Sequence, residues 1–154
     1  MRYSGIIKND FSAAPRVSVS FFVQGCPWLP HHCKGCHNPE TWDFEGGKEF
    51  TYQTLNEIIE GLTANGITRS LAIMGGEPLC EANAFLTLLV VKTVRERLPK
   101  TKIYIWTGYE YEDLKCHYLD SHIKMILDYA DYLIDGPYIE EFRDITLSMR
   151  GSSN

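Results

Sequence analysis

The sequence has no cluster of one charge and no long apolar run. Its 15 Lys and Arg residues are scattered among 20 Asp and Glu, for a formal net charge of -5, so the electrostatic footprint of a nucleic-acid binder is missing. The most apolar run, 85–91, stops at Lys92, well short of the roughly 20 residues of a membrane helix. The first residues contain no apolar segment of signal-peptide length. We therefore expect a cytoplasmic protein that binds neither nucleic acid nor membrane.

A disulfide framework is also absent. The chain has five cysteines, an odd number, and thiols stay reduced in the cytosol. Three of them share the segment QGCPWLPHHCKGCHNPE, 24–40, with three histidines: Cys26, Cys33, Cys36, His31, His32 and His37. Metal binding or redox chemistry is the default interpretation of these clustered cysteines. We expect Cys80 and Cys116 to be structural packing residues.

Strand and helix patterns alternate along the chain. Strands are predicted over 17–23, 70–74, 102–107 and 132–135, and helices over 51–66, 83–97 and 114–129. This order implies right-handed crossovers and a mostly parallel sheet. Four strands are too few to close an eight-stranded barrel. We expect one α/β domain over 1–154, an open partial (βα) barrel with a mostly parallel sheet and helices outside.

Polar or glycine-rich segments follow each predicted strand. The cysteine segment follows the first strand, GGEP (75–78) the second, TGY (107–109) the third and DGPY (135–138) the fourth. Ligands of open α/β sheets lie at the carboxyl ends of the strands. We expect these four turns to form one active-site rim, where Thr107 and Gly108 could contact an adenine or ribose.

The cysteine spacing alone leaves alternatives open. The pair Cys33 and Cys36 is compatible with a zinc knuckle, a dithiol redox site or part of a cluster site. Adding Cys26 favours an iron–sulfur cluster with three protein ligands and one open iron, but a zinc site completed by a histidine is also compatible. The GGEP turn favours the cluster, because its glycines allow close backbone approach and its carboxylate suits a bound ammonium group.

Six stretches carry a resemblance to a known family: SFFVQGC, HHCKGCHNPETWDFEGG, MGGEPL, YIWTGYEYEDL, LIDGPYIEE and RGSSN. On these, the sequence resembles the radical S-adenosylmethionine superfamily and, within it, the activating proteins of anaerobic ribonucleoside-triphosphate reductase. The resemblance implies a [4Fe–4S] cluster held by Cys26, Cys33 and Cys36. It also implies S-adenosylmethionine as a second cofactor, bound to the open iron, with Gly75, Gly76 and Glu77 around its methionine amino group.

The resemblance further implies a reaction. The reduced cluster would pass one electron to S-adenosylmethionine and yield a 5′-deoxyadenosyl radical, which would take a hydrogen atom from a glycine of the reductase large subunit. The product would be a stored glycyl radical on that partner. Hydrogen-atom abstraction needs no acid–base pair, so we expect no catalytic residue beyond the ligands of the cluster and of S-adenosylmethionine. A flavodoxin is the expected one-electron donor.

The first cysteine interval departs from the family pattern. The superfamily usually spaces its cysteines C-x3-C-x2-C, whereas six residues separate Cys26 from Cys33, as if Trp28, Leu29 and Pro30 had been inserted. Two prolines in this interval favour a defined bulge that still delivers Cys26. The alternatives are an activase of another glycyl-radical enzyme, of the pyruvate formate-lyase type, and a non-catalytic Cys3His zinc-binding module.

Overall fold

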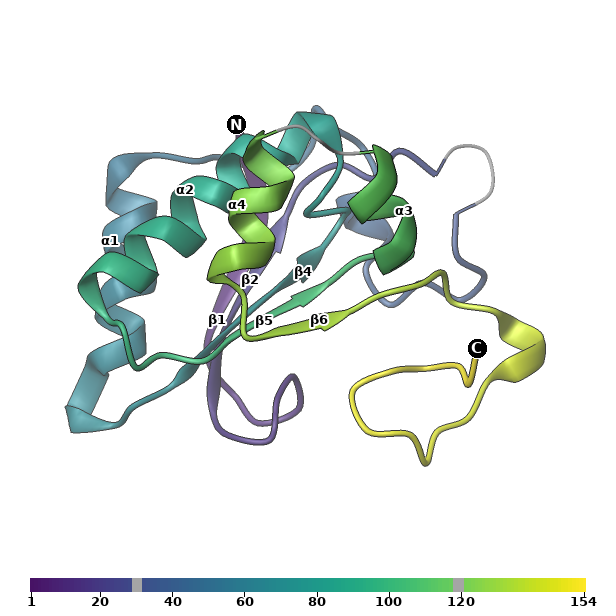
Figure 1. The fold of residues 1–154 in the computed structure, drawn as a ribbon. Coiled ribbons are helices and arrows are strands. Elements are labelled where there is room, and N and C mark those ends of the chain that lie inside the picture. Colours follow the sequence, from purple (N-terminus) through teal and green to yellow (C-terminus); the bar gives the residue numbers. More distant parts are fainter. Residues whose placement is uncertain (29–31, 118–120) are drawn as a thin grey trace.

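One open sheet organises the chain. The computed structural model describes residues 1–28, 32–117 and 121–154, with the side chains of all but 116, 117 and 121. Its strands run in the order β3-β1-β2-β4-β5-β6 (Figure 1). Their bounds are β1 Arg2–Asp10, β2 Ser18–Val23, β3 Lys48–Glu49, β4 Ser70–Gly75, β5 Ile103–Trp106 and β6 Tyr132–Ile134. Strands β2, β4, β5 and β6 are parallel, while β1 is antiparallel to both of its neighbours.

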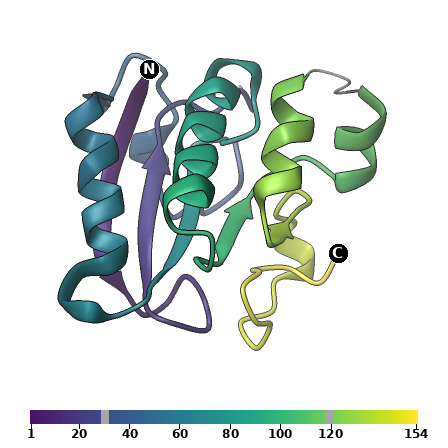
Figure 2. The same ribbon diagram turned by 60° about the vertical axis from the view of Figure 1, so that its left-hand side comes forward.

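Helices cover one face of this sheet. They are α1 Tyr52–Thr63, α2 Glu81–Arg97, α3 Tyr111–His117 and α4 Ser121–Tyr129. Short 3-10 turns lie at Pro39–Thr41, Ala64–Gly66 and Glu140–Phe142. Figures 1 and 2 show α1, α2 and α4 side by side over the same face. No helix in the described parts of the chain combines the length and the apolar content that crossing a membrane requires.

The core lies between these helices and the sheet. Alternate strand residues, such as Val19 and Phe21 of β2 and Ile73 of β4, are fully buried against apolar residues of α1, α2 and α4. The intervening positions point to the other face, where Ser18 and Ser20 are also buried. This alternation follows from the two-residue period of a strand.

Helix α1 shows how the local sequence fixes an element. Thr51 and Thr54 form a reciprocal capping box at its start, with both side-chain to backbone distances at 3.3 Å. Leu55, Ile58 and Leu62 then recur at helical spacing and are buried. The cap satisfies backbone N–H groups that would otherwise lack partners, and the apolar stripe attaches the helix to the sheet.

The predicted strands and helices are confirmed in position, with three differences. The pattern over 114–129 corresponds to α3 and α4, and residues 118–120 between them lie outside the described residues. Strands β1 and β3 were not predicted, and because they are antiparallel the sheet is mixed. An open α/β sheet is confirmed, whereas a partial barrel with a mostly parallel sheet is not. Gly5 and two register shifts interrupt the pattern of β1, so its sequence does not alternate strictly.

An ionic network links the start of β5 to the start of β6. The Asp131 carboxylate accepts hydrogen bonds from Arg95 at 2.7 Å, from Lys102 at 2.7 Å and from the backbone N–H of Ile103 at 3.0 Å. Burial alone would raise the pKa of Asp131, but these donors outweigh it and lower that pKa below its ordinary value. The charged carboxylate therefore stabilises the folded state.

We predict that Asp131→Asn lowers the free energy of unfolding by about 1–3 kcal/mol at neutral pH, because it weakens charge-assisted bonds to Arg95 and Lys102. The folded pKa lies below the unfolded value of about 3.9. The stabilisation is therefore complete above that value and is lost as the pH falls through the folded pKa. Urea titrations of the wild-type and Asp131→Asn proteins, at pH values from 7 downward, measure this difference in the free energy of unfolding. Asp128→Asn, which breaks only the exposed pair with Lys124, serves as the control, and a pH-independent effect of Asp131→Asn would contradict the prediction.

Candidate functional site

The turns at the carboxyl edge of the parallel strands meet through backbone hydrogen bonds. The N–H of Cys26 donates to the carbonyl of Trp42 at 3.1 Å. The N–H of Glu77 donates to the carbonyl of Gly25 at 2.8 Å, which joins the GGEP turn to the cysteine segment. The side-chain amide of Asn83 donates to the carbonyls of both Gly25 and Glu77. The expectation that these turns share one rim is confirmed for the first two.

The two glycines of GGEP are required by this packing. Gly75 has φ +106, a conformation that favours glycine, and a Cβ there would stand 2.8 Å from the carbonyl oxygen of Val23. A Cβ on Gly76 would collide with the backbone of Gly25. The sequence analysis expected these glycines to allow close approach to a ligand, whereas the close approach in the structure is to the backbone that enters the cysteine segment.

The Glu77 carboxylate links the second turn to the third. Glu77 is 2% exposed. Its Oε1 accepts hydrogen bonds from the backbone N–H of Leu79 at 3.0 Å and from the Thr107 hydroxyl at 2.7 Å, and its Oε2 accepts one from the N–H of Gly108 at 2.8 Å. Burial raises the pKa of Glu77, and these donors oppose the rise. The structure thus brings Glu77, Thr107 and Gly108 together, and the carboxylate serves as an internal clamp.

The three clustered cysteines are free thiols at the same edge. Cys26 is buried, and Cys33 and Cys36 are half-buried. Burial raises the pKa of Cys26 to about 11 and also raises that of Cys33, and the neighbouring thiols add to both shifts. Without a bound metal these two groups are therefore protonated at neutral pH, and a metal must displace their protons.

The surroundings of these sulfurs also favour their deprotonated form. The N–H of Asn38 donates to Cys36 Sγ at 3.5 Å. The backbone at Trp28 and at Tyr138 lowers the pKa of Cys26 and of Cys33, respectively, against the larger effect of burial. Hydrogen bonds to sulfur tune iron–sulfur clusters. Three thiols in these surroundings fit a cluster with cysteine ligands.

A preformed site for a single metal ion is not present in the part of the chain that the structure describes, where no three His, Cys, Asp or Glu side chains converge on one point. Ligands of one zinc ion converge in a tetrahedron. Cysteines of a cubane cluster bind separate irons and need not converge in this way.

The remaining candidate ligands have other surroundings. The His32 ring stacks on Trp42 at 3.9 Å between centroids and 7° between planes, and its Nε2 has no hydrogen-bond partner among the described residues. His37 is exposed, and His31 lies outside the described residues. Cys80 is 3% exposed, and burial raises its pKa to about 11. The side chain of Cys116 also lies outside the described set.

A pocket of about 180 Å³ opens beside Cys33. Its walls come from the cysteine segment and from the third and fourth turns: Trp28, His32, Cys33, Lys34, Gly108, Pro137 and Tyr138. Sequence reasoning identified Cys33 and Gly108 but missed the lining role of Trp28 and Tyr138. Their aromatic character within the two turns was the available signal.

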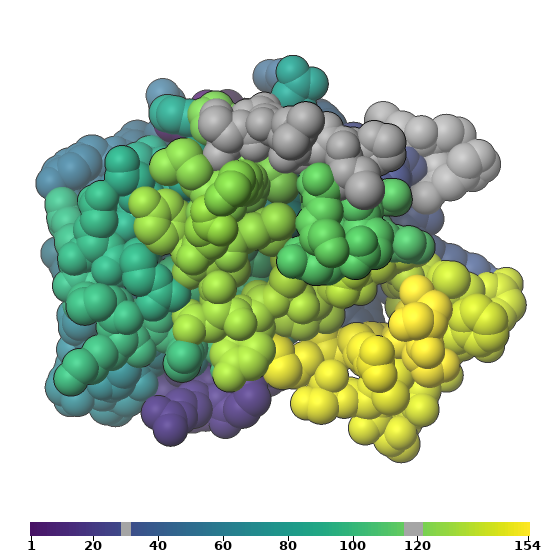
Figure 3. Space-filling model, viewed as in Figure 1, coloured from purple at the N-terminus to yellow at the C-terminus, as the bar shows by residue number. Residues whose placement is uncertain are grey.

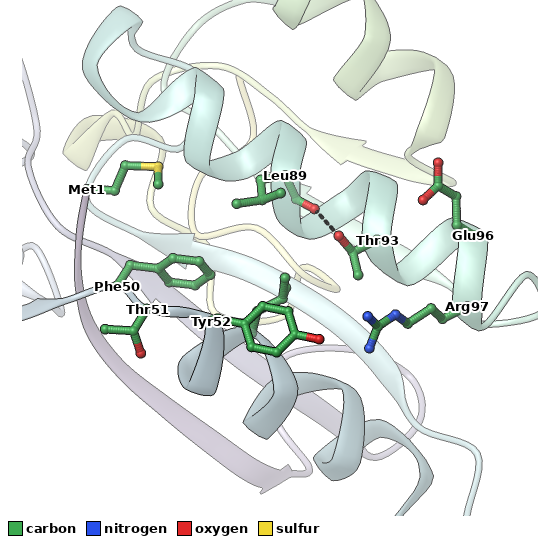
Figure 4. A pocket seen from close by; sticks show the side chains of 9 residues that line it. Met1, Phe50, Thr51, Tyr52, Leu89, Thr93, Glu96 and Arg97 are labelled. Atoms are coloured by element: carbon green, nitrogen blue, oxygen red, sulfur yellow. Dashed lines mark hydrogen bonds between the residues drawn. The ribbon is translucent and has the colours of Figure 1, made fainter.

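A larger pocket of about 380 Å³ lies elsewhere, between α1 and α2. Figure 4 shows Tyr52 of α1 facing Leu89, Thr93 and Arg97 of α2 across it. None of the predicted site residues lines this pocket. Its size alone therefore does not make it the candidate site.

The C-terminal residues fold back onto the rim. The indole N–H of Trp106 donates to the carbonyl of Met149 at 2.8 Å, and the Asn154 amide donates to the carbonyl of Pro137 at 2.9 Å. Figure 3 shows this segment, in yellow, as one surface region beside α3. The RGSSN stretch thus helps to hold the DGPY turn.

Comparison with known proteins identifies the class of domain to which the chain belongs. A family model described as a 4Fe-4S single cluster domain matches residues 15–154, so the chain belongs to that class of iron–sulfur domains. The chain is 35% identical to the anaerobic ribonucleoside-triphosphate reductase-activating protein of Vibrio cholerae, over 100% of this chain and 95% of the relative. The proteins of the same name from bacteriophage T4 and Escherichia coli K12 are 36% and 32% identical, over 91% and 96% of their lengths. The chain belongs to this family of activating proteins.

We predict that Thr107→Val lowers the free energy of unfolding by about 1–3 kcal/mol, because Glu77 loses a buried hydrogen-bond donor while the side-chain volume is kept. Urea titration measures the loss. Thr93→Val is the matched control, since its hydroxyl donates only to the Leu89 carbonyl one turn earlier in α2. Thr107→Ser should recover most of the lost stability. Equal effects at positions 107 and 93 would show that the Glu77 clamp contributes nothing.

Proposed function

We propose that this protein is an iron–sulfur activating enzyme that cleaves S-adenosylmethionine reductively and generates a glycyl radical on anaerobic ribonucleoside-triphosphate reductase. The observation that carries the proposal is the set of three free cysteines at the rim that Glu77 holds together. The reductase that the relatives are named after supports the choice of partner.

Cys26, Cys33 and Cys36 are the proposed cluster ligands. When bound, the [4Fe–4S] cluster supplies the single electron for cleavage of S-adenosylmethionine. The chain supplies the thiols, the N–H of Asn38 that donates to Cys36, and burial of Cys26. These contributions tune the cluster and limit its contact with water.

The second proposed cofactor site is the rim beside the cysteines. Gly75, Gly76 and Glu77 would bind the methionine end of S-adenosylmethionine, and Thr107 and Gly108 its adenosyl end. Because Thr107 and Gly108 hold the Glu77 carboxyl group in place, its oxygens have a fixed orientation at the site. Preoriented acceptor oxygens favour an ammonium group without the cost of reorganisation.

The remaining parts of the proposal concern architecture and partners. We infer that 1–154 is a single radical S-adenosylmethionine domain, in which the open sheet is the chain's version of a partial (βα) barrel. The partner is the large subunit of the reductase, and the one-electron donor is a flavodoxin-type protein. The abstraction step needs no acid–base residue of this chain.

The test of the function uses two candidate partners. Anaerobically reconstituted protein is mixed with S-adenosylmethionine, dithionite and either the reductase large subunit or pyruvate formate-lyase. We expect a glycyl radical signal by electron paramagnetic resonance, with formation of 5′-deoxyadenosine, on the reductase alone. A signal only on pyruvate formate-lyase would show that the chain is an activase of that class of glycyl-radical enzyme. A colourless protein that contains zinc and yields no radical would show that the chain is a zinc-binding module and not this enzyme.

A second prediction separates the proposed ligands from the nearby cysteine. Cys26→Ala, Cys33→Ala and Cys36→Ala should each retain little cluster iron, because each removes one of three thiolate ligands. Cys80→Ala, at a buried site outside this set, should retain iron near the wild-type level, as should His37→Ala. Iron and sulfide assays after anaerobic reconstitution measure this. A loss of iron in Cys80→Ala equal to that in Cys33→Ala would contradict the ligand assignment.

A further inference from the structure

Trp28 lies where the cysteine segment meets the third turn. Its indole lies over Gly108, and its Nε1, Cε2 and Cζ2 are 3.0, 3.3 and 3.4 Å from the position that a Cβ on Gly108 would take. The same ring packs against Tyr109, with 4.9 Å between centroids and 54° between planes. A Cβ at position 108 would press on the indole, which would have to shift by a few tenths of an ångström to make room.

The Trp28 side chain also lies near Glu77, where it lowers the pKa of that carboxyl against the effect of burial. Gly108, on which the indole lies, donates its N–H to the same carboxyl at 2.8 Å. Trp28 thus lies two residues after a proposed cluster ligand and against the turn that holds the buried carboxyl.

The interval from Cys26 to Cys33 needs such a contact. Six residues separate the two cysteines, and the entropic cost of holding the ends of a segment together grows with its length. Trp28, near the start of this interval, and Cys33, directly after it, line the same pocket with Gly108. Fixing Trp28 on that turn therefore restricts the direction in which the chain leaves Cys26.

We propose that Trp28 is a positioning residue that fastens the start of the interval between Cys26 and Cys33 to the TGY turn and so orients the Cys26 thiol for the cluster. The ring packs on Gly108 and Tyr109, and Gly108 in turn donates its N–H to Glu77 of the GGEP turn. This inference rests on the proposed function, because it concerns the same cluster.

The test compares Trp28→Ala, which removes ring and indole N–H, with Trp28→Phe, which keeps a ring. Each protein is reconstituted anaerobically, and iron content, the rate of iron loss to a ferrous chelator and the electron paramagnetic resonance spectrum of the reduced cluster are measured. We expect Trp28→Ala to lose iron about 10-fold faster or more, as is typical when a contact that orients a metal ligand is removed. Trp28→Phe should hold iron better than Trp28→Ala, with g-values shifted from wild type. Phe11→Ala, at an aromatic residue 81% exposed in another loop, is the control.

A double-mutant cycle keeps the proposal testable if Trp28→Ala is poorly folded. Gly108→Ala places a methyl group against the indole and should speed iron loss by displacing Trp28, whereas the same change added to Trp28→Phe should have a smaller effect. Additive effects would overturn the proposal, as would a folded Trp28→Ala protein with wild-type iron retention and g-values. If the wild-type chain assembles no cluster, the proposed function fails, and this inference fails with it.

Discussion

The rim of this protein depends on one buried carboxylate. Glu77 is almost completely removed from water, and a charge in that position is costly unless donors surround it. The donors come from its own turn and from the turn after β5. The N–H of the same residue donates to the carbonyl of Gly25, at the start of the cysteine segment. Because three turns meet at one residue, displacing one of them disturbs the bonds of the others. The turns therefore hold one another in place, and the cysteines are positioned relative to the pocket beside them.

The same constraint explains how a small domain can direct demanding chemistry. The thiols of Cys26 and Cys33 are buried enough that their pKa values are raised, which opposes metal binding, while nearby backbone groups favour the thiolates. When a cluster binds, these thiols lose their protons, so protons are released as the cluster assembles. In the proposed reaction the reactive steps belong to the cofactors. The chain contributes orientation, preoriented acceptor oxygens and exclusion of water.

Much of this fold could be predicted from the sequence, because the spacing of apolar residues indicates which positions are buried. The strands β2, β4, β5 and β6 and the helices α1 and α2 were predicted since their apolar residues recur at strand or helix spacing. Strand β1 was missed because Gly5 and register shifts break its alternation, and β3 because it has only two residues. The cysteines were found from their spacing, and the GGEP turn from its glycines and carboxylate directly after a buried strand. The bonds from Thr107 and Gly108 to Glu77 were not found, since they depend on which turns meet in three dimensions.

The central claim is that the three thiols at the Glu77 rim hold a four-iron cluster with one iron left open for S-adenosylmethionine. Electron paramagnetic resonance of the anaerobically reconstituted, reduced protein, recorded with and without S-adenosylmethionine, tests it most directly. The account predicts a reduced [4Fe–4S] signal whose g-values change when S-adenosylmethionine is added. A reduced cluster signal that S-adenosylmethionine leaves unchanged, or the binding of zinc in place of any cluster, would contradict it.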